Sequence, residues 1–305
     1  MRIILIGQAA FAEQVLDGLR ARGHEIAAVY CPPDAPGGKR DLLVTRACDL
    51  AIPVHQHPTL KGADVAREFG GYGADLGVLA YVTQIVPQSV FAAPRLGSIC
   101  FHPSLLPGYR GGSAIAWQII KGEARTGVTV FWVDSGIDTG PILLQKAAVI
   151  GPDDTAGTLY YNTLFKLGVA TVLESVDLIA AGAAPRIAQN ASQASYDPLC
   201  RDEHARVDWS RPASEVYNLI RGCDPQPGAY VVRAGERVRL YDARRAEASA
   251  GPPGAIAAID ERGIVVAAGD GSIAIRRLRV GDKKIAAPEA AAALRLVVGA
   301  PLADH

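Results

Sequence analysis

The segment RIILI at residues 2–6, directly followed by Gly7, decides the fold class of this chain. It is a short apolar run of the kind found in a strand that is buried on both faces. Apolar residues then recur at helical spacing at Phe11, Val15, Leu16 and Leu19, which predicts a helix. The chain therefore begins with a buried strand that leads into a helix.

The same alternation of strand and helix continues through the first half of the chain. LGVLAY at residues 76–81, for example, is another apolar strand. Such alternation predicts an α/β fold with an open, mostly parallel sheet and helices on both faces. The predicted strands after the first cover residues 25–30, 76–81, 98–101, 127–133 and 142–150, and the predicted later helices cover residues 42–50, 63–69, 113–121 and 155–181.

The domain organisation follows from where this alternation stops. Residues 1–182 are predicted to form the first domain, which closes at Gly182 after its last helix. Residues 183–205 lack periodicity and carry Gln, Asn, Ser and Pro, so they are predicted to be a linker. Residues 206–305 should form a second domain, with a helix at 212–221 that Ser210 could cap. The short strands predicted there, at 230–232, 238–241, 255–259, 264–267 and 273–280, suit a small β-barrel.

The composition excludes several classes of protein. The 305 residues are 49% hydrophobic, and the 31 Lys and Arg residues balance 31 Asp and Glu residues, so a nucleic-acid partner is disfavoured. No stretch approaches the roughly 18 apolar residues that cross a bilayer, and no leader is recognisable, so we expect a cytoplasmic protein without membrane attachment. The five cysteines are widely spaced without a C-x-x-C pair and are expected to be reduced thiols.

The turn after the first strand does not favour a nicotinamide cofactor. The segment IGQAAFAE contains one glycine, Gly7, where a dinucleotide fingerprint needs three. A tight turn is the simpler interpretation of Gly7. NAD is therefore not expected, although a ligand could still contact this loop.

The strongest local signal is FHPSLLPGYRGGSAIAW at residues 101–117. His102 ends a predicted strand, and the loop after it contains prolines that fix φ and glycines that permit tight turns. A second signal is DSGIDTG at residues 134–140, a polar loop between two apolar strands. Asp138 lies 36 residues after His102, which leaves room for a helix and a strand that bring the two loops together. Asp134 and Asp138 could also be turn residues only.

No metal site is expected. His55 and His57 flank Gln56 near the end of a predicted strand, where they could face opposite sides, and the sequence offers them no third ligand.

Together, HPSLLPGYRG and DSGIDTG at this distance resemble the 10-formyltetrahydrofolate-dependent formyltransferase family. The resemblance is most detailed to the amino-terminal hydrolase domain of 10-formyltetrahydrofolate dehydrogenase. It also rests on IGQAAF, LAYVTQIVP, SICFHPSLLPGYRGGSAIAW, FWVDSGIDTGPILLQK, DDTAGTLYYNTLF and VDWSRPASEVYNLIRGCDPQPGAY, and so covers nearly the whole chain.

The resemblance implies a Rossmann-like catalytic domain at 1–182 and a smaller OB-like β-barrel domain at 206–305. It implies 10-formyltetrahydrofolate as the formyl donor, with no metal and no NAD. It also implies that the folate lies across the strand ends. The residues implied in its binding are Leu79, Ala80, Tyr81, Gln84, Ile85, Val86, Pro87, Val133, Asp134, Ser135, Gly136 and Ile137.

The family's catalytic set is Asn, His and Asp, which the resemblance carries to Cys100, His102 and Asp138. Cys100 stands where the family has Asn, and a thiol is a much weaker hydrogen-bond donor to an oxyanion. The hydrolase domain also lacks this Asn, so the change is compatible with activity. Cys100 is expected to be a buried small residue rather than a nucleophile.

The expected activity is transfer of the formyl group, through a tetrahedral intermediate, to water or to a small-molecule amine. His102 would donate a proton near the formyl oxygen, and Asp138 would order the attacking group and receive its proton. The alternatives are methionyl-tRNA formyltransferase, which the neutral charge disfavours, and a folate-binding protein with little catalysis. The sequence leaves the acceptor and the oligomeric state open.

Overall fold

The computed structural model describes residues 1–247 and 251–304 and divides the chain into two compact units. The first unit comprises Met1–Gly111, Gly127–Ala148 and Thr163–Tyr196, and the second comprises Gly112–Thr126, Val149–Asn162 and the chain from Asp197 onward.

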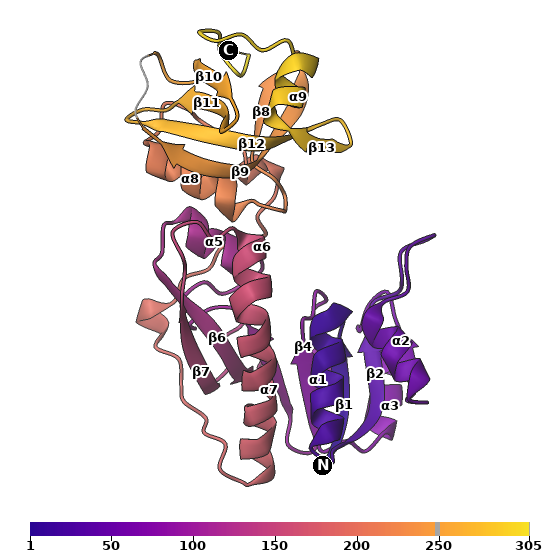
Figure 1. Ribbon diagram of the computed structural model, residues 1–305. Helices are drawn as coiled ribbons and strands as arrows, with labels where there is room; N and C mark the ends of the chain where they lie inside the picture. The colour runs from indigo at the N-terminus through magenta and orange to yellow at the C-terminus, as the bar shows by residue number, and fades with distance from the viewer. Residues whose placement is uncertain (248–250, 305) are drawn as a thin grey trace. The chain divides into compact units, whose positions relative to one another are not determined.

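The first unit is built on a mostly parallel sheet. Its strands are β1 (Arg2–Gly7), β2 (Glu25–Cys31), β3 (Val54–Gln56), β4 (Leu76–Ala80), β5 (Ser98–His102), β6 (Arg125–Trp132) and β7 (Ile142–Val149), in the spatial order β3-β2-β1-β4-β5-β6-β7. In this order, each neighbouring pair from β3 across to β5 is parallel, whereas β6 runs antiparallel to β5. The Rossmann-like, mostly parallel sheet predicted from the sequence is thereby confirmed (Figure 1).

Helices cover this sheet because its central strands are apolar on both faces. Every residue of β4, and all of β1 after Arg2, is buried. Helix α1 lies along α7 in Figure 1, where the Phe11 ring meets the Phe165 ring edge-on at 5.6 Å between centroids. The helices of this unit are α1 (Ala9–Ala21), α2 (Leu42–Asp49), α3 (Ala63–Gly71), α4 (Gln88–Phe91) and α7 (Phe165–Ala180).

Gly7 is required by close packing. A Cβ at this position would lie 2.2 Å from the carbonyl oxygen of Ala80, the last residue of the neighbouring strand β4. Any larger residue would push the two central strands apart, since main-chain atoms cannot yield as a side chain can. The tight-turn interpretation of Gly7 therefore has a structural basis.

The helix predicted over residues 155–181 is interrupted. Thr155 caps α6 (Ala156–Leu159), and its hydroxyl accepts a hydrogen bond from the Thr158 amide at 3.1 Å. A π-helical turn over Tyr160–Leu164 follows, and only then does α7 begin. The interruption falls where the chain passes from the second unit to the first. A change from α-helix to π-helix cannot be predicted from the spacing of apolar residues alone.

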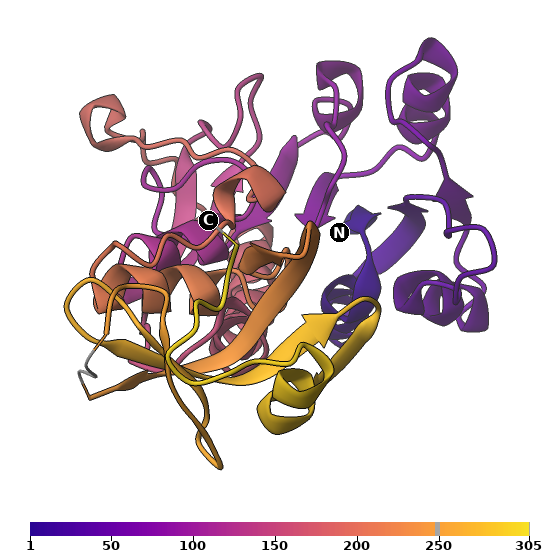
Figure 2. The same ribbon diagram turned by 90° about the horizontal axis from the view of Figure 1, so that it is seen from above.

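The second unit holds an antiparallel sheet in the order β10-β11-β12-β9-β8, with β13 paired to β12. The long strands β9 and β12 lie side by side (Figure 2). Its strands are β8 (Tyr230–Arg233), β9 (Glu236–Ala246), β10 (Ile256–Asp260), β11 (Gly263–Ala267), β12 (Ser272–Val280) and β13 (Lys283–Ala286), and its helices are α5 (Ala114–Ile120), α6, α8 (Ala213–Gly222) and α9 (Ala287–Ala293). A separate, strand-rich second domain is confirmed, and its assignment as an OB-like barrel stays a prediction.

One capping prediction in this unit is wrong. Ser210 does not cap α8, because its hydroxyl and its amide both donate to Asp208. The first amide of the helix, that of Ala213, is bound instead by the carboxylate of Asp270 at 2.6 Å. A residue 57 positions away thus supplies the cap, which local sequence cannot reveal. No helix within the described residues is long and apolar enough to span a bilayer.

Candidate active site

His102 is the last residue of β5, and its side chain is only 7% exposed. Its Nε2 lies 2.7 Å from the main-chain carbonyl oxygen of Tyr109, in the loop that follows the strand. A carbonyl oxygen can only accept, so Nε2 carries the proton and donates it to this oxygen. The loop therefore fixes both the orientation of the ring and the protonation of one of its nitrogens.

Asp138 meets the other nitrogen of this ring. Its Oδ2 lies 3.5 Å from His102 Nδ1 and accepts a hydrogen bond from the Gly111 amide at 2.7 Å. Asp138 has a φ of 54°, a left-handed conformation that a short polar side chain tolerates. The structure thus brings together the histidine and the aspartate that the sequence singled out.

Both nitrogens of the His102 ring face hydrogen-bond acceptors. Nε2 donates to the Tyr109 carbonyl, and Nδ1 lies near a carboxylate oxygen of Asp138. Because both side chains are largely buried, their attraction is weakly screened by solvent.

The path of the chain does not by itself place Asp138 beside His102. Strand β6 runs antiparallel to β5, with Trp132 opposite Ile99 and Thr129 opposite His102. The loop that carries Asp138 therefore leaves β6 at the end of β5 away from His102, and must fold back along the sheet. Contacts from elsewhere in the chain hold it there.

Those contacts come from residues 185–196, which we call the strap. Gln189 Nε2 donates to the main-chain carbonyls of Asp138 at 2.9 Å and Gly140 at 2.7 Å. Its Oε1 accepts two hydrogen bonds from the guanidinium of Arg110. The Ser195 hydroxyl accepts from the Tyr109 amide at 2.8 Å. The strap therefore links the loop after His102 to the loop of Asp138.

Sequence reasoning missed this role of Gln189, Ser195 and Arg110. The segment that contains Gln189 and Ser195 was predicted to be a linker because it lacks periodicity. The polar composition of this segment was the one indication of such a role. Amide and hydroxyl side chains on a segment that runs across a domain surface can form hydrogen bonds with the main chain of the loops there.

Cys100 precedes His102 by two residues and is partly buried. Burial, together with the charge of Asp138, raises the pKa of the Cys100 thiol. The neutral thiol is a poor nucleophile, which agrees with the expectation of a small packed residue. Cys100 packs against the same buried apolar cluster as Val86 and Val133, and Leu79 belongs to that cluster.

Leu79, Val86 and Val133 belong to the predicted folate-binding set. Ala80 is buried at the end of β4, and Pro87 precedes α4. By contrast, three large side chains of the set remain exposed on loops: Tyr81 at 41%, Ile85 at 70% and Ile137 at 55%. Apolar side chains, some of them exposed to solvent, are typical of a surface that binds an aromatic ligand.

Asp134, Ser135 and Gly136 form the first turn of the Asp138 loop. Asp134 Oδ1 accepts from the Gly136 amide at 3.0 Å and from the Thr139 hydroxyl at 2.6 Å. This is an Asx turn, which gives Asp134 the structural role that the sequence left open. Asp138, in contrast, faces the buried histidine.

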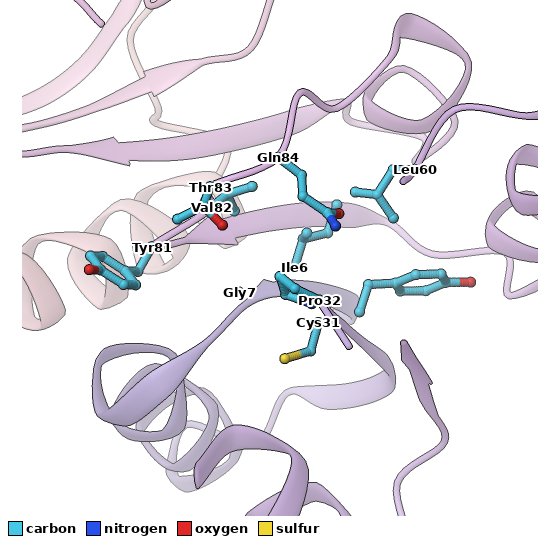
Figure 3. Close-up of a pocket in the computed structure, with 10 residues that line it drawn as sticks. Ile6, Gly7, Cys31, Pro32, Leu60, Tyr81, Val82, Thr83 and Gln84 are labelled. Carbon is cyan, nitrogen blue, oxygen red and sulfur yellow. The ribbon is translucent and has the colours of Figure 1, made fainter. Parts of the chain in front are cut away.

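A narrow pocket opens where β1, β2 and β4 end, with room for about 10 Å³, little more than one water molecule (Figure 3). The strand order reverses between β1 and β4, and this is the position where open α/β sheets bind ligands. Gln84 reaches across it and donates to the main-chain carbonyls of His57 and Pro58. The lining residues are Ile6, Gly7, Tyr30, Cys31, Pro32, Leu60, Tyr81, Val82, Thr83 and Gln84.

The prediction that His55 and His57 lack a third partner is wrong. Their rings lie nearly parallel, 6° apart, and each has a nitrogen 3.1 Å from a different oxygen of Glu68. Residues two apart in an extended chain share a face, and α3 supplies the carboxylate.

Comparisons with known proteins agree with the fold and the motifs. Residues 1–173 match the formyl transferase model, and residues 200–294 match the model of the formyl transferase C-terminal domain. The chain is 38% identical over 300 residues to mitochondrial 10-formyltetrahydrofolate dehydrogenase of Homo sapiens, covering 93% of this chain and 32% of that protein. It thus spans about a third of the length of such dehydrogenases.

A second curated protein and a solved structure are similar to this chain over almost all of its length. Methionyl-tRNA formyltransferase of Geobacter sulfurreducens is 38% identical over 310 residues, covering 100% of this chain and 97% of that protein. HypX from Aquifex aeolicus, solved in complex with tetrahydrofolic acid, has a TM-score of 0.72 at 23% identity, over 98% of this chain and 48% of that one. At that identity the HypX match supports the fold alone. On the matched domains and the full-length similarity, the chain belongs to the formyl transferase family.

Proposed function

We propose that this protein takes the formyl group from 10-formyltetrahydrofolate and passes it to water or to a small-molecule amine. The observation that carries the proposal is the buried pair of His102 and Asp138, held by the loops of a formyl transferase fold. Relatives named as 10-formyltetrahydrofolate dehydrogenases support the choice of donor.

The reaction requires a proton donor and a proton acceptor. The oxygen of water, or the nitrogen of an amine, attacks the formyl carbon, and the formyl oxygen gains negative charge. The bond from the formyl carbon to N10 of the folate then breaks, and N10 takes a proton. The Tyr109 carbonyl engages Nε2 of His102, so Nδ1, which lies 3.5 Å from Asp138, is the nitrogen that would stabilise the charged oxygen and supply that proton.

Asp138 suits the role of acceptor. Both of its side-chain contacts with described residues, to Gly111 and His102, fall on Oδ2. Oδ1 is therefore the oxygen that can orient the attacking water or amine and take its proton. When Asp138 takes that proton it loses its negative charge, so it no longer attracts the positive charge of His102. His102 then releases its own proton to N10 more readily, and the two proton transfers assist each other.

The donor would lie against the apolar cluster around Cys100. Leu79 belongs to this cluster, and Val86 and Val133 pack against it. Tyr81 and Ile137, from the same predicted folate-binding set, are exposed apolar side chains. An aromatic pterin on this surface would bring N10 and its formyl group toward His102. The weak donor at Cys100 would leave His102 as the main hydrogen-bond donor to the formyl oxygen.

The balanced charge of the chain favours a small acceptor over a polyanion. A second candidate acceptor is initiator methionyl-tRNA, because the similarity to the Geobacter enzyme covers 97% of that protein. A folate-binding protein with little catalysis remains the alternative that Cys100 motivates.

The test is to mix the protein with 10-formyltetrahydrofolate without an acceptor, follow tetrahydrofolate by absorbance and measure formate. Parallel reactions contain an amino-sugar nucleotide or initiator methionyl-tRNA. Release of formate that requires His102 and Asp138 supports the hydrolase, whereas a formylated amine or tRNA assigns the corresponding transferase. Folate binding without turnover under every condition would refute the catalytic proposal.

A further inference from the structure

A cluster of metal-ligating side chains lies outside the His102 and Asp138 pair. His55 is in β3, His57 follows that strand, and Glu68 is in α3. Their three ligand atoms all lie within 4.8 Å of one another. The side chains are 21%, 30% and 35% exposed, so an ion from solvent can reach them.

The spacing of the ligand atoms suits a single ion. The two His-to-Glu contacts, from His55 Nδ1 and from His57 Nε2, are both 3.1 Å. A tetrahedral ion with ligands at about 2.0–2.2 Å places neighbouring ligand atoms about 3.3–3.6 Å apart. The two His-to-Glu contacts already have about this spacing, whereas the widest separation in the cluster, which lies within 4.8 Å, must shorten for all three side chains to bind one ion.

Neighbouring tyrosines already orient the ligands. The hydroxyl of Tyr72 lies 2.6 Å from His55 Nε2, the nitrogen that faces away from Glu68. Tyr30 donates to Glu68 Oε1 at 2.9 Å, and its ring stacks on that of His55 at 4.8 Å between centroids. Metal-binding histidines and carboxylates are usually held by such outer partners.

Metal binding needs an ionised carboxylate and neutral imidazoles, so an ion competes with protons for these three ligands and its binding releases the protons that they hold.

We propose that His55, His57 and Glu68 bind one divalent first-row transition-metal ion, with Zn²⁺ as the preferred occupant. Two imidazoles and one carboxylate favour such a metal over Mg²⁺, which prefers oxygen ligands. Three protein ligands leave a fourth position for water or for a group of a bound molecule. The site adjoins the pocket of Figure 3, because Tyr30 lines that pocket and also holds Glu68.

The experiment is calorimetric titration of the metal-free full chain with Zn²⁺, Fe²⁺ under anaerobic conditions, and Mg²⁺. Each titration is run in two buffers that differ in ionisation enthalpy, which reports the protons released. The variants are His57→Ala, Glu68→Gln and Tyr72→Phe, with His204→Ala as the matched control outside the cluster. Glu68→Gln keeps the size of the side chain and an acceptor for Tyr30, so it should fold.

We expect one Zn²⁺ per chain with release of protons, and no Mg²⁺ binding. His57→Ala and Glu68→Gln should each weaken Zn²⁺ binding by more than about 100-fold, and Tyr72→Phe by about tenfold, within the range for outer partners. His204→Ala should bind Zn²⁺ like the unaltered protein. Tighter binding of Fe²⁺ than Zn²⁺ would overturn the assignment of the preferred metal.

Absence of stoichiometric Zn²⁺ binding would overturn the site itself, as would equal loss in His204→Ala and His57→Ala. Cobalt substitution gives a second readout, since tetrahedral Co²⁺ absorbs strongly in the visible range and this band should disappear in Glu68→Gln. Neither readout involves formyl transfer, so failure of the proposed activity and failure of this site can be told apart.

Discussion

Replacement of Asp138 by asparagine tests the proposed chemistry most directly. Asparagine keeps the shape of the side chain and an oxygen that can accept from the Gly111 amide, but it removes the charge. Two unit charges 3.5 Å apart attract each other by about 5 kcal/mol at an effective dielectric constant of about 20. The amide dipole recovers part of this, so we expect kcat/KM to fall about 1,000-fold, or about 4 kcal/mol.

The assay is release of tetrahydrofolate from 10-formyltetrahydrofolate, followed over a range of pH. Asp134→Asn is the matched control, since it makes the same chemical change in the same loop. The carboxylate of Asp134 only accepts hydrogen bonds from Gly136 and Thr139, and an amide oxygen can do the same. We therefore expect Asp134→Asn to lower kcat/KM less than tenfold.

Folding must be shown to be intact by thermal melting and by folate binding. The reasoning would be refuted if Asp138→Asn retained more than about a tenth of the activity, or if both asparagine variants lost equal activity. The first result would mean that the charge beside His102 contributes little. The second would mean that the loop tolerates no change at either aspartate.

Three other predictions follow from packing and protonation. Gly140→Ala should destabilise the first unit by several kcal/mol, seen as a lower Tm, because the new Cβ would lie 1.7 Å from a carbonyl oxygen of β6. Maleimide at pH 8 should label exposed Cys48 well before Cys100, whose burial raises its pKa, as peptide mass spectrometry would show. The hydrogen bond from Arg239 lowers the pKa of Asp202, so its stabilising effect is present above the unfolded pKa of about 3.9 and is lost as pH falls through the lower folded value. Urea unfolding from pH 6 to pH 3 should therefore depend less steeply on pH in Arg239→Gln than in the unaltered protein.

Most of the fold could be predicted from the sequence because it depends on local patterns. The strand at residues 76–81 and the helix at residues 42–50 end within one residue of their observed limits, since apolar runs and helical spacing mark them clearly. Strand β13 and helix α9 were not predicted. Their exposed lysines and alanine-rich composition carry little periodicity, and pairing with β12 stabilises the strand.

The candidate site could be predicted only in part. His102 and Asp138 stand in distinctive loops, so their residue types and spacing indicated a pair. The contribution of Gln189 depends on the course of the chain 51 residues beyond Asp138, and no local pattern reports it. The same is true of Glu68, which approaches His57 only after α3 has packed on the sheet.

The strap has a practical consequence for the design of shortened proteins. Its residues belong to the first unit although they follow the last helix of that unit, α7. A fragment that stops at residue 182 would keep His102 and Asp138 but would lose the Gln189 amide that binds the Asp138 loop. A shortened protein should therefore extend at least to Tyr196, and a protease cut between residues 183 and 196 should lower the activity by loosening the Asp138 loop.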